Sequence, residues 1–427
     1  MNNSIAFPQT SADNTFNVFR RIYGVLINSW IIIPAILFYH EVSIYTTNIP
    51  ILDDYNIPLD FVMKFSTAGF WEKLKLLFGQ VQEHRLVPSK LIYIGYYYLT
   101  GEINFSIIGM IGNLHLLGTA FGGIYFIKKY AAPSWIIPAF IWVLVVFDLN
   151  TYENASICMN GVGNYGVICY FFLTLYFYDK SDKWIPLAVL FQFFTIFANG
   201  NGLPAGVFII LFNLSTSRKK KIVSIITSCV LIGLYLATLH IVELPDKTPY
   251  NLNTVFTYFI RQSGAHFSFD YSFLTGWLVL ISLACLFPWR KLLDRKFTPI
   301  LCIFLFVFST MVLTALFRAC YTYARFNTSR YMIYPQMLTG LLCLLIWMRL
   351  KTRKQKWIGG VLLPGIMLFT YAGNYEFGRA GLERTNYRVT SRKYWYPDPK
   401  WAEKVVKEAC ERNIYCIEDN RLTDITK

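Results

Sequence analysis

Long apolar runs separated by short polar segments recur along most of this chain. A helix needs roughly 20 apolar residues to cross a hydrocarbon core of ~30 Å, and most of these runs approach that length. They predict an all-α polytopic membrane protein with about eleven membrane-spanning helices, within a range of roughly ten to twelve. The expected helices cover residues 22–39, 103–126, 133–148, 161–178, 184–198, 202–214, 222–242, 271–289, 297–317, 331–348 and 357–373.

The runs at 184–198 and 202–214 are the shortest neighbouring pair, and they meet at Asn199-Gly200-Asn201-Gly202. Three interpretations fit them: two short spans, a re-entrant hairpin, or a pair of broken helices. Each of the three returns the chain to the same side of the membrane. The predicted topology after residue 214 is therefore the same in all cases.

The basic residues cluster in short turns between the apolar runs, which is the pattern of cytoplasmic loops. A single threading puts every such cluster inside, with the N-terminus in and the C-terminus out. The net charge of +15 is thus explained by topology, and no nucleic-acid partner is expected. The clusters are Arg20-Arg21, Lys128-Lys129, Lys180 with Lys183, residues 218–221, Arg290-Lys291 with Arg295-Lys296, and residues 349–356.

The outer segments hold most of the acids and histidines, so we expect the working surface on the non-cytoplasmic side. Residues 1–373 form the predicted transmembrane domain, whose first outer loop spans 40–102, and residues 374–427 form a small non-cytoplasmic tail. The inner loops are short, and the chain has no P-loop, dinucleotide-binding glycine motif or HExxH zinc motif. The sequence therefore gives no support to nucleotide chemistry on the inner side.

An acidic pair, Asp53-Asp54, stands shortly after the first predicted helix and is followed by Tyr55. One carboxylate of such a pair can act as a general base while the second tunes its pKa. The pair can also bind a cation, or be an ordinary solvated turn. We favour Asp53 as the base and Asp54 as its support.

Residues 57–79 predict an amphipathic juxtamembrane helix. Phe70, Leu74 and Phe78 recur at helical spacing, and charged residues such as Glu72 and Lys73 fall between them. Such a helix can lie in the membrane interface. It can equally pack against the bundle.

Three further groups of polar residues make candidate binding positions on the outer side. Arginine and lysine there suit a phosphate, although interfacial snorkelling gives the same pattern. Asparagines in a glycine-rich turn suit close approach of a ligand, although a plain tight turn gives that pattern too. The candidates are Glu83, His84, Arg85 and Lys90 in the first outer loop, Asn199 and Asn201 in the turn, and Arg325, Arg330 and Tyr331 before the tenth helix.

Cys410 and Cys416 are the two cysteines that do not belong to apolar runs. Residues 400–410 predict a short helix, and residues 415–418 a short strand. An outside tail would meet an oxidising compartment, where a disulfide can close this small loop if the Cα atoms come within ~7 Å. We therefore expect the two residues to be joined.

The order of these elements resembles the GT-C superfamily of membrane glycosyltransferases. The order Asp53-Asp54-Tyr55, Glu83-His84-Arg85, the turn at 199–202 and Ser329-Arg330-Tyr331 is most similar to bacterial proteins near the phage-type, serotype-converting O-antigen glucosyltransferases. The resemblance implies a bacterial inner-membrane enzyme with a periplasmic active site. It also implies a polyprenyl-phosphate sugar donor, a glycan or lipid-linked glycan acceptor such as O-antigen lipopolysaccharide, and inversion at the anomeric carbon.

By this resemblance, Asp53 or Asp54 would deprotonate the acceptor hydroxyl, and Arg85, Lys90 and Arg330 would hold the phosphate leaving group. No cofactor is predicted. Participation of a divalent cation stays open, because no third carboxylate stands at metal-ligand spacing.

Two other functions compete with the glycosyltransferase. A transporter or flippase for lipid-linked saccharides predicts charged residues in mid-helix and an internal repeat, neither of which is evident. A polymerase or ligase of such saccharides typically has its large outer loop late in the chain, whereas the longest loop between helices is here the first.

The topology makes the first testable prediction. A reporter that works only after export, fused after Lys427, should be active, and a reporter that works only in the cytoplasm should be silent there. The same pair of fusions after Lys221 should give the opposite result. Cytoplasmic activity after Lys427 would contradict an outer placement of the site.

Overall fold

The computed structural model describes residues 29–81, 84–130, 134–240, 251–291, 294, 297–320, 326–391 and 394–417. Apart from an isolated bridge between Val81 and His84, these residues form helices, turns and irregular segments, with no strand among them. Within the described ranges, five stretches are long and apolar enough to cross a membrane: Phe105–Lys129, Ile136–Ser156, Arg218–Ala237, Thr298–Arg318 and Ser329–Arg349. The all-α class is confirmed, and the apolar helices indicate a membrane protein. The number of spans and their orientation stay predictions.

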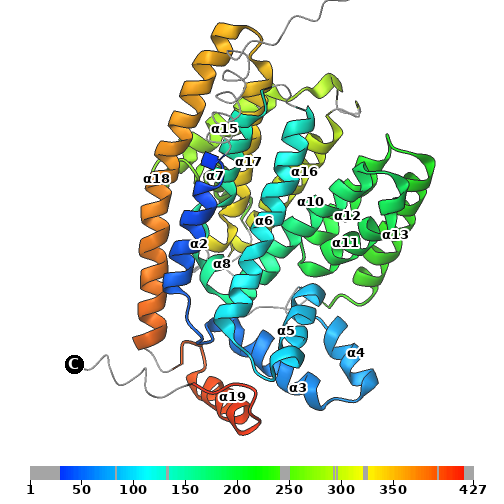
Figure 1. Cartoon of the computed structure of the whole chain (residues 1–427), viewed down its shortest axis with the longest axis vertical. Helices are drawn as coiled ribbons and strands as arrows, with labels where there is room; N and C mark the ends of the chain where they lie inside the picture. The colour runs from blue at the N-terminus through cyan, green and yellow to red at the C-terminus, as the bar shows by residue number, and fades with distance from the viewer. Residues whose placement is uncertain are drawn as a thin grey trace, which may run out of the picture.

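Apart from the helix at residues 252–264, which no apolar run predicts, the helices of the bundle follow the predicted runs in position. They are α2 (Ile33–Tyr45), α6 (Phe105–Tyr130), α7 (Ile136–Val146), α10 (Gly166–Asp179), α11 (Ile185–Ala198), α12 (Gly202–Asn213), α13 (Arg218–Ala237), α14 (Leu252–Gly264), α15 (Ser272–Leu286), α16 (Thr298–Arg318), α17 (Ile333–Arg349) and α18 (Arg353–Ser391). Aromatic packing fills the centre, where Phe171 of α10 stacks on Phe306 of α16 with ring centroids 4.5 Å apart. In Figure 1, α18 and α2 lie on one side of the bundle, and α11 to α13 lie on the other.

The described basic turns meet at one end of the bundle. Lys129 pairs with Asp179, and the Nζ atom of Lys220 lies 3.7 Å from Oδ1 of Asp182. At the same end, Trp347 donates from Nε1 to the carbonyl of Ser134 at 2.9 Å. In addition, Nη2 of Arg349 donates to the carbonyl of Leu286 at 3.0 Å. These described basic turns therefore lie at a common end of the bundle, and the side of the membrane that this end faces stays a prediction. Arg20 and Arg21 lie outside the described residues.

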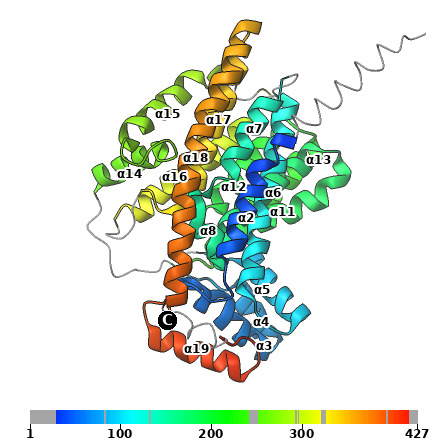
Figure 2. The same cartoon turned by 60° about the vertical axis from the view of Figure 1, so that its left-hand side comes forward.

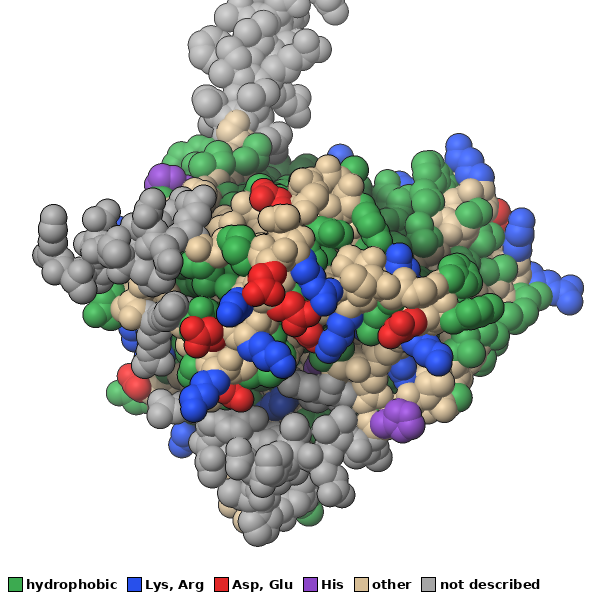
Figure 3. Space-filling view, turned by 90° about the horizontal axis from the view of Figure 1, so that it is seen from below, with side chains coloured by type: hydrophobic (Ala, Val, Ile, Leu, Met, Phe, Trp, Pro, Cys, Tyr) green, Lys and Arg blue, Asp and Glu red, His purple; other side chains and the backbone are tan. Residues whose placement is uncertain are grey.

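The opposite end carries a separate layer of short helices: α3 (Phe61–Thr67), α4 (Phe70–Phe78), α5 (Val87–Thr100) and α19 (Pro399–Glu411). In both Figure 1 and Figure 2, α19 lies beside this layer. Val62 and Phe65 of α3 share a hydrophobic core with Val405 and Ala409 of α19. The C-terminal segment is thus packed onto the first outer loop. Seen from this end, acidic and basic side chains gather between apolar flanks (Figure 3).

The predicted helix at 57–79 is divided in two. Ala68 and Gly69 are extended, so that α3 ends before them and α4 begins after them. All of α4 is at least partly exposed, with Phe70 at 68% and Trp71 at 75%. This exposed aromatic face fits a helix lying in the membrane interface, which is one of the two alternatives that the sequence leaves open.

Four helices differ from the prediction. The helix α2 continues to Tyr45, past the predicted end at 39, and α14 lies in a segment that was predicted to be a loop. The apolar pattern ends the last span at 373, but α18 continues to Ser391, so the predicted start of the tail at 374 falls inside it. Polar residues such as Glu376 and Arg379 mark the end of an apolar run without ending a helix. The helix α5 was not predicted, because its residues were assigned to a loop.

The predicted disulfide is confirmed, since Cys410 and Cys416 are bonded with Cα atoms 4.6 Å apart. The helix expected at 400–410 is present as α19. Its first turn is capped by the side chain of Asp398, which accepts from the amides of Lys400 and Trp401. Residues 415–417 do not form the expected strand. Glu418 lies outside the described residues.

Candidate functional site

The acidic pair lies in a short 3-10 turn, Leu52–Asp54, at the end of the bundle that carries the layer of short helices. Leu52 has a φ of 51°, which is uncommon for a residue with a branched side chain. Its amide donates to the carbonyl of Trp395 at 3.0 Å, and this bond holds the turn against the segment after α18. The two carboxylates that follow consequently have fixed and different surroundings.

The side chain of Asp54 lies in the protein interior. Its Oδ1 accepts from the amide of Met159 at 2.8 Å, and its Oδ2 accepts from the amide of Ile51 at 3.2 Å. The side chain is buried, and this burial raises the pKa of Asp54 to about 7, partly opposed by the amides. Asp54 therefore joins the first outer loop to the segment before α10.

Asp53 is only partly buried and interacts with arginine instead. Burial raises the pKa of Asp53, and the charges of Arg330 and Arg318 act in the opposite direction. The charges of Asp53 and Arg330 therefore interact electrostatically although the residues are far apart in the sequence, and their membership of one site stays a prediction. A carboxylate whose pKa is raised by burial is suited to accept a proton at a pH closer to neutral.

Arg330 belongs to the short turn Ser329–Tyr331, which is anchored on the helix α8 (Tyr152–Ser156). The Ser329 hydroxyl donates to the carbonyl of Asn150 at 2.7 Å and accepts from the amide of Glu153 at 3.1 Å. The Glu153 carboxylate accepts from the amide of Arg330 at 3.3 Å, and the same oxygen lies 3.9 Å from its Nε. That Nε is buried and makes no hydrogen bond among the described residues.

A chain of side-chain amides links the predicted asparagine turn to Arg330. Asn199 donates to Asn164, Asn164 donates to Asn154, and each of these bonds is 2.9 Å long. Asn154 then donates to the carbonyl of Arg330, also at 2.9 Å. Two segments that the sequence singled out separately therefore belong to one hydrogen-bonded network.

The other predicted members of the turn region lie close to this network. The Nδ1 atom of His84 accepts from the amide of Gly200 at 3.2 Å, and Asn201 donates to the hydroxyl of Tyr334 at 2.7 Å. The Tyr331 ring lies 5.6 Å from the Arg330 guanidinium and 6.0 Å from that of Arg318.

Arg85 and Lys90 are directed to backbone carbonyls rather than to Asp53. Lys90 is buried, and its ammonium donates to the carbonyls of Leu76, Leu77 and Gly79, at the C-terminal end of α4. Burial, followed by the charge of Arg85, lowers the pKa of Lys90 to about 8.

Arg85 donates to the carbonyl of Phe78 at 2.8 Å and also to the carbonyl and hydroxyl of Thr238, just past the end of α13. Both cations thus satisfy helix C-termini, whose carbonyls lack partners within the helix.

The remaining predicted residues have simpler placements. Tyr55 is fully buried, with its ring 5.6 Å from that of Tyr396. Glu83 and Arg325 lie outside the described residues. Among the described residues there is no group of three or more His, Cys, Asp or Glu side chains placed to hold a metal ion.

Sequence reasoning missed Glu153, Asn154 and Asn164 as members of the site. The available signal was the outer loop at 148–160, which contains Glu153. No protein-family model and no curated protein matches this sequence.

The surroundings of Asp54 predict a structural role. In Asp54→Asn, one of the two oxygens that accept from backbone amides is replaced by an NH₂ group. This NH₂ group then faces a backbone N–H, which is also a donor, so that N–H loses its acceptor. An unsatisfied buried donor costs about 1–3 kcal/mol. We therefore expect a lower thermal midpoint for Asp54→Asn in detergent, measured by scanning fluorimetry. Asp53→Asn should leave the midpoint nearly unchanged, and equal midpoints for both variants would contradict the assignment.

Proposed function

We propose that this chain is a glycosyltransferase of the bacterial inner membrane. It transfers a sugar from a polyprenyl-phosphate donor to a glycan or lipid-linked glycan on the non-cytoplasmic side, with inversion. The observation that supports this proposal most directly is the electrostatic interaction of the Asp53 carboxylate with Arg330 and Arg318 at one end of an apolar helix bundle. A base and a phosphate-binding cation are the two groups that the reaction requires.

In the proposed reaction, Asp53 takes the proton of the acceptor hydroxyl. The hydroxyl oxygen attacks the anomeric carbon from the face opposite the phosphate. The bond between that carbon and the phosphate oxygen breaks, and polyprenyl phosphate leaves with the electron pair. Arg330 and Arg318 stabilise the charge that develops on the leaving phosphate. Arg85 and Lys90 take no direct part, because their hydrogen bonds stabilise α4 and its contact with α13.

A flippase for lipid-linked saccharides is the second candidate, and one observation favours it. Asp148, His266 and Asn374 form a buried polar group between α7, the α14–α15 turn and α18. Asp148 accepts from Asn374 at 2.9 Å, and its Oδ2 lies 3.7 Å from Nδ1 of His266. Buried ionisable groups of this kind occur along transport pathways. A flippase moves its substrate without cleaving it, so release of polyprenyl phosphate separates the two functions.

The first activity prediction concerns Asp53. Asp53→Asn should fold normally and reduce the release of polyprenyl phosphate by roughly 10²-fold or more, because the general base is lost. The assay uses the purified protein in lipid nanodiscs with a panel of polyprenyl-phosphate hexoses and envelope glycans. Asp60→Asn, which removes a more exposed carboxylate paired with Lys64, is the matched control and should keep full activity. An active Asp53→Asn variant would exclude the mechanism.

The second activity prediction concerns pH. Transfer should fall as the pH drops through the pKa of Asp53, because the protonated carboxyl cannot accept a proton. Arg330 lowers this pKa, so Arg330→Gln should move the acid limb of the rate profile to higher pH as well as slow the reaction. Arg353→Gln, at the opposite end of the molecule, should leave the limb in place. An unshifted limb in Arg330→Gln would show that Asp53 is not the titrating base.

A further inference from the structure

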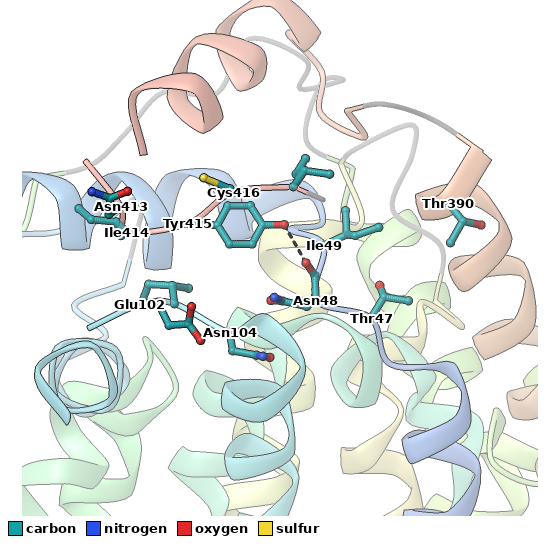
Figure 4. A pocket seen from close by; sticks show the side chains of 12 residues that line it. Thr47, Asn48, Ile49, Glu102, Asn104, Thr390, Asn413, Ile414, Tyr415 and Cys416 are labelled. Atoms are coloured by element: carbon teal, nitrogen blue, oxygen red, sulfur yellow. Dashed lines mark hydrogen bonds between the residues drawn. The ribbon is translucent and has the colours of Figure 1, made fainter. Parts of the chain in front are cut away.

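A cavity of about 570 Å³ lies at the outer end, apart from the Arg330 turn. Its walls come from the segment after α2, the start of α6, the end of α18 and the disulfide loop after α19 (Figure 4). The volume falls within the range of about 300–1,000 Å³ that is typical of small-molecule sites. Its polar lining side chains are Thr47, Asn48, Glu102, Asn104, Thr390 and Asn413.

The lining suits an uncharged ligand that is rich in hydroxyl groups. It contains amides, hydroxyls and one carboxylate, which together donate and accept hydrogen bonds. No lysine, arginine or histidine is among the described lining residues, so this part of the lining offers a phosphate no cation. Ile49, Ile103 and Ile414 add apolar surface, which fits the CH-bearing faces of a sugar ring. This chemistry contrasts with the arginines beside Asp53.

Polar groups in the cavity are available for a ligand. Among the described residues, the side chains of Thr47, Glu102 and Asn413 form no hydrogen bond. The Oδ1 atom of Asn104 accepts from the amide of Ile107 at 3.1 Å, and that of Asn48 accepts from the amide of Phe105 at 2.8 Å. These bonds fix the two amide groups and leave their NH₂ ends as donors.

The cavity wall is also held in place before any ligand binds. The hydroxyl of Tyr415 donates to the carbonyl of Asn48 at 2.7 Å, and the amide of Ile103 donates to the carbonyl of Ile414 at 2.8 Å. The Cys410–Cys416 disulfide closes the loop that makes both contacts. A preformed wall lowers the entropy cost of binding.

The cavity lies within reach of Asp53. Ile49 lines it and precedes Asp53 by four residues, which span at most about 14 Å even when fully extended. We propose that this cavity binds uncharged sugar units of the acceptor glycan, so that a hydroxyl of the same glycan reaches Asp53. This inference rests on the proposed function and names the acceptor as a neutral oligosaccharide.

The test begins with binding. Wild-type protein in nanodiscs is applied to an array of uncharged and acidic bacterial oligosaccharides, and the glycans retained are titrated by calorimetry. We expect uncharged glycans to bind, and Asp53→Asn to bind them equally well. The double variant Thr47→Val with Glu102→Ala should bind them at least about fivefold more weakly, because it loses hydrogen bonds to the ligand. Glu72→Gln on α4 is the control and should bind as the wild type does.

The kinetic arm uses the same variants with polyprenyl-phosphate hexoses. The double variant should raise KM for the acceptor at least about fivefold while leaving kcat at saturating acceptor unchanged. Three results would overturn the cavity assignment. The array could retain only acidic glycans, it could retain no glycan, or the double variant could leave KM for the acceptor unchanged. If the wild type releases polyprenyl phosphate in those cases, the proposed function stands alone. If neutral glycans bind the cavity but no panel donor is cleaved, the proposed function fails and the saccharide site stands.

Discussion

The Asp54 carboxylate accepts hydrogen bonds from the backbone amides of Ile51 and Met159. The arrangement of the candidate site depends on these two hydrogen bonds. One bond closes the 3-10 turn, and the other joins it to a segment about one hundred residues later in the chain. The neighbouring Asp53 is less buried than Asp54 and interacts electrostatically with Arg330 and Arg318. Two adjacent carboxylates thereby acquire different tasks, one within the fold and one toward the arginines.

The same physical solution recurs in the outer layer, where charged side chains hold backbone groups. Lys90 satisfies three carbonyls at the end of α4, and Arg85 joins that end to Thr238. The outer helices are short, so their unpaired terminal carbonyls are numerous relative to their length. Cations at these positions therefore stabilise the layer. These contacts account for the buried positions of Arg85 and Lys90 at the end of the bundle opposite the basic turns.

The fold was predictable wherever an apolar run of the sequence and a helix of the structure cover the same residues. The central helices match their runs because a lipid-facing backbone must satisfy its hydrogen bonds within a helix. Prediction failed where a helix continues beyond the end of its apolar run, as α18 does to Ser391. It also failed where a helix contains both polar and apolar residues, as α5 does. Of the candidate site, Asp53 and Arg330 could be singled out from the sequence as charged residues next to predicted helices, and their roles stay predictions. Asn154 and Asn164 were not, since their bonds depend on tertiary packing that leaves no pattern in the sequence.

In the proposed reaction, the positive charge of Arg330 is balanced first by carboxylates and then by the leaving phosphate. Before transfer, Arg330 interacts with two carboxylates, Asp53 and Glu153. When Asp53 accepts the hydroxyl proton it becomes neutral, and the attraction it exerted on Arg330 is lost. At that same moment the departing phosphate gains negative charge. The guanidinium then has one fewer competing anion, while Glu153 still holds the backbone of its turn in place. The cation is thus directed to the leaving group by the proton transfer itself, with no movement of the backbone required.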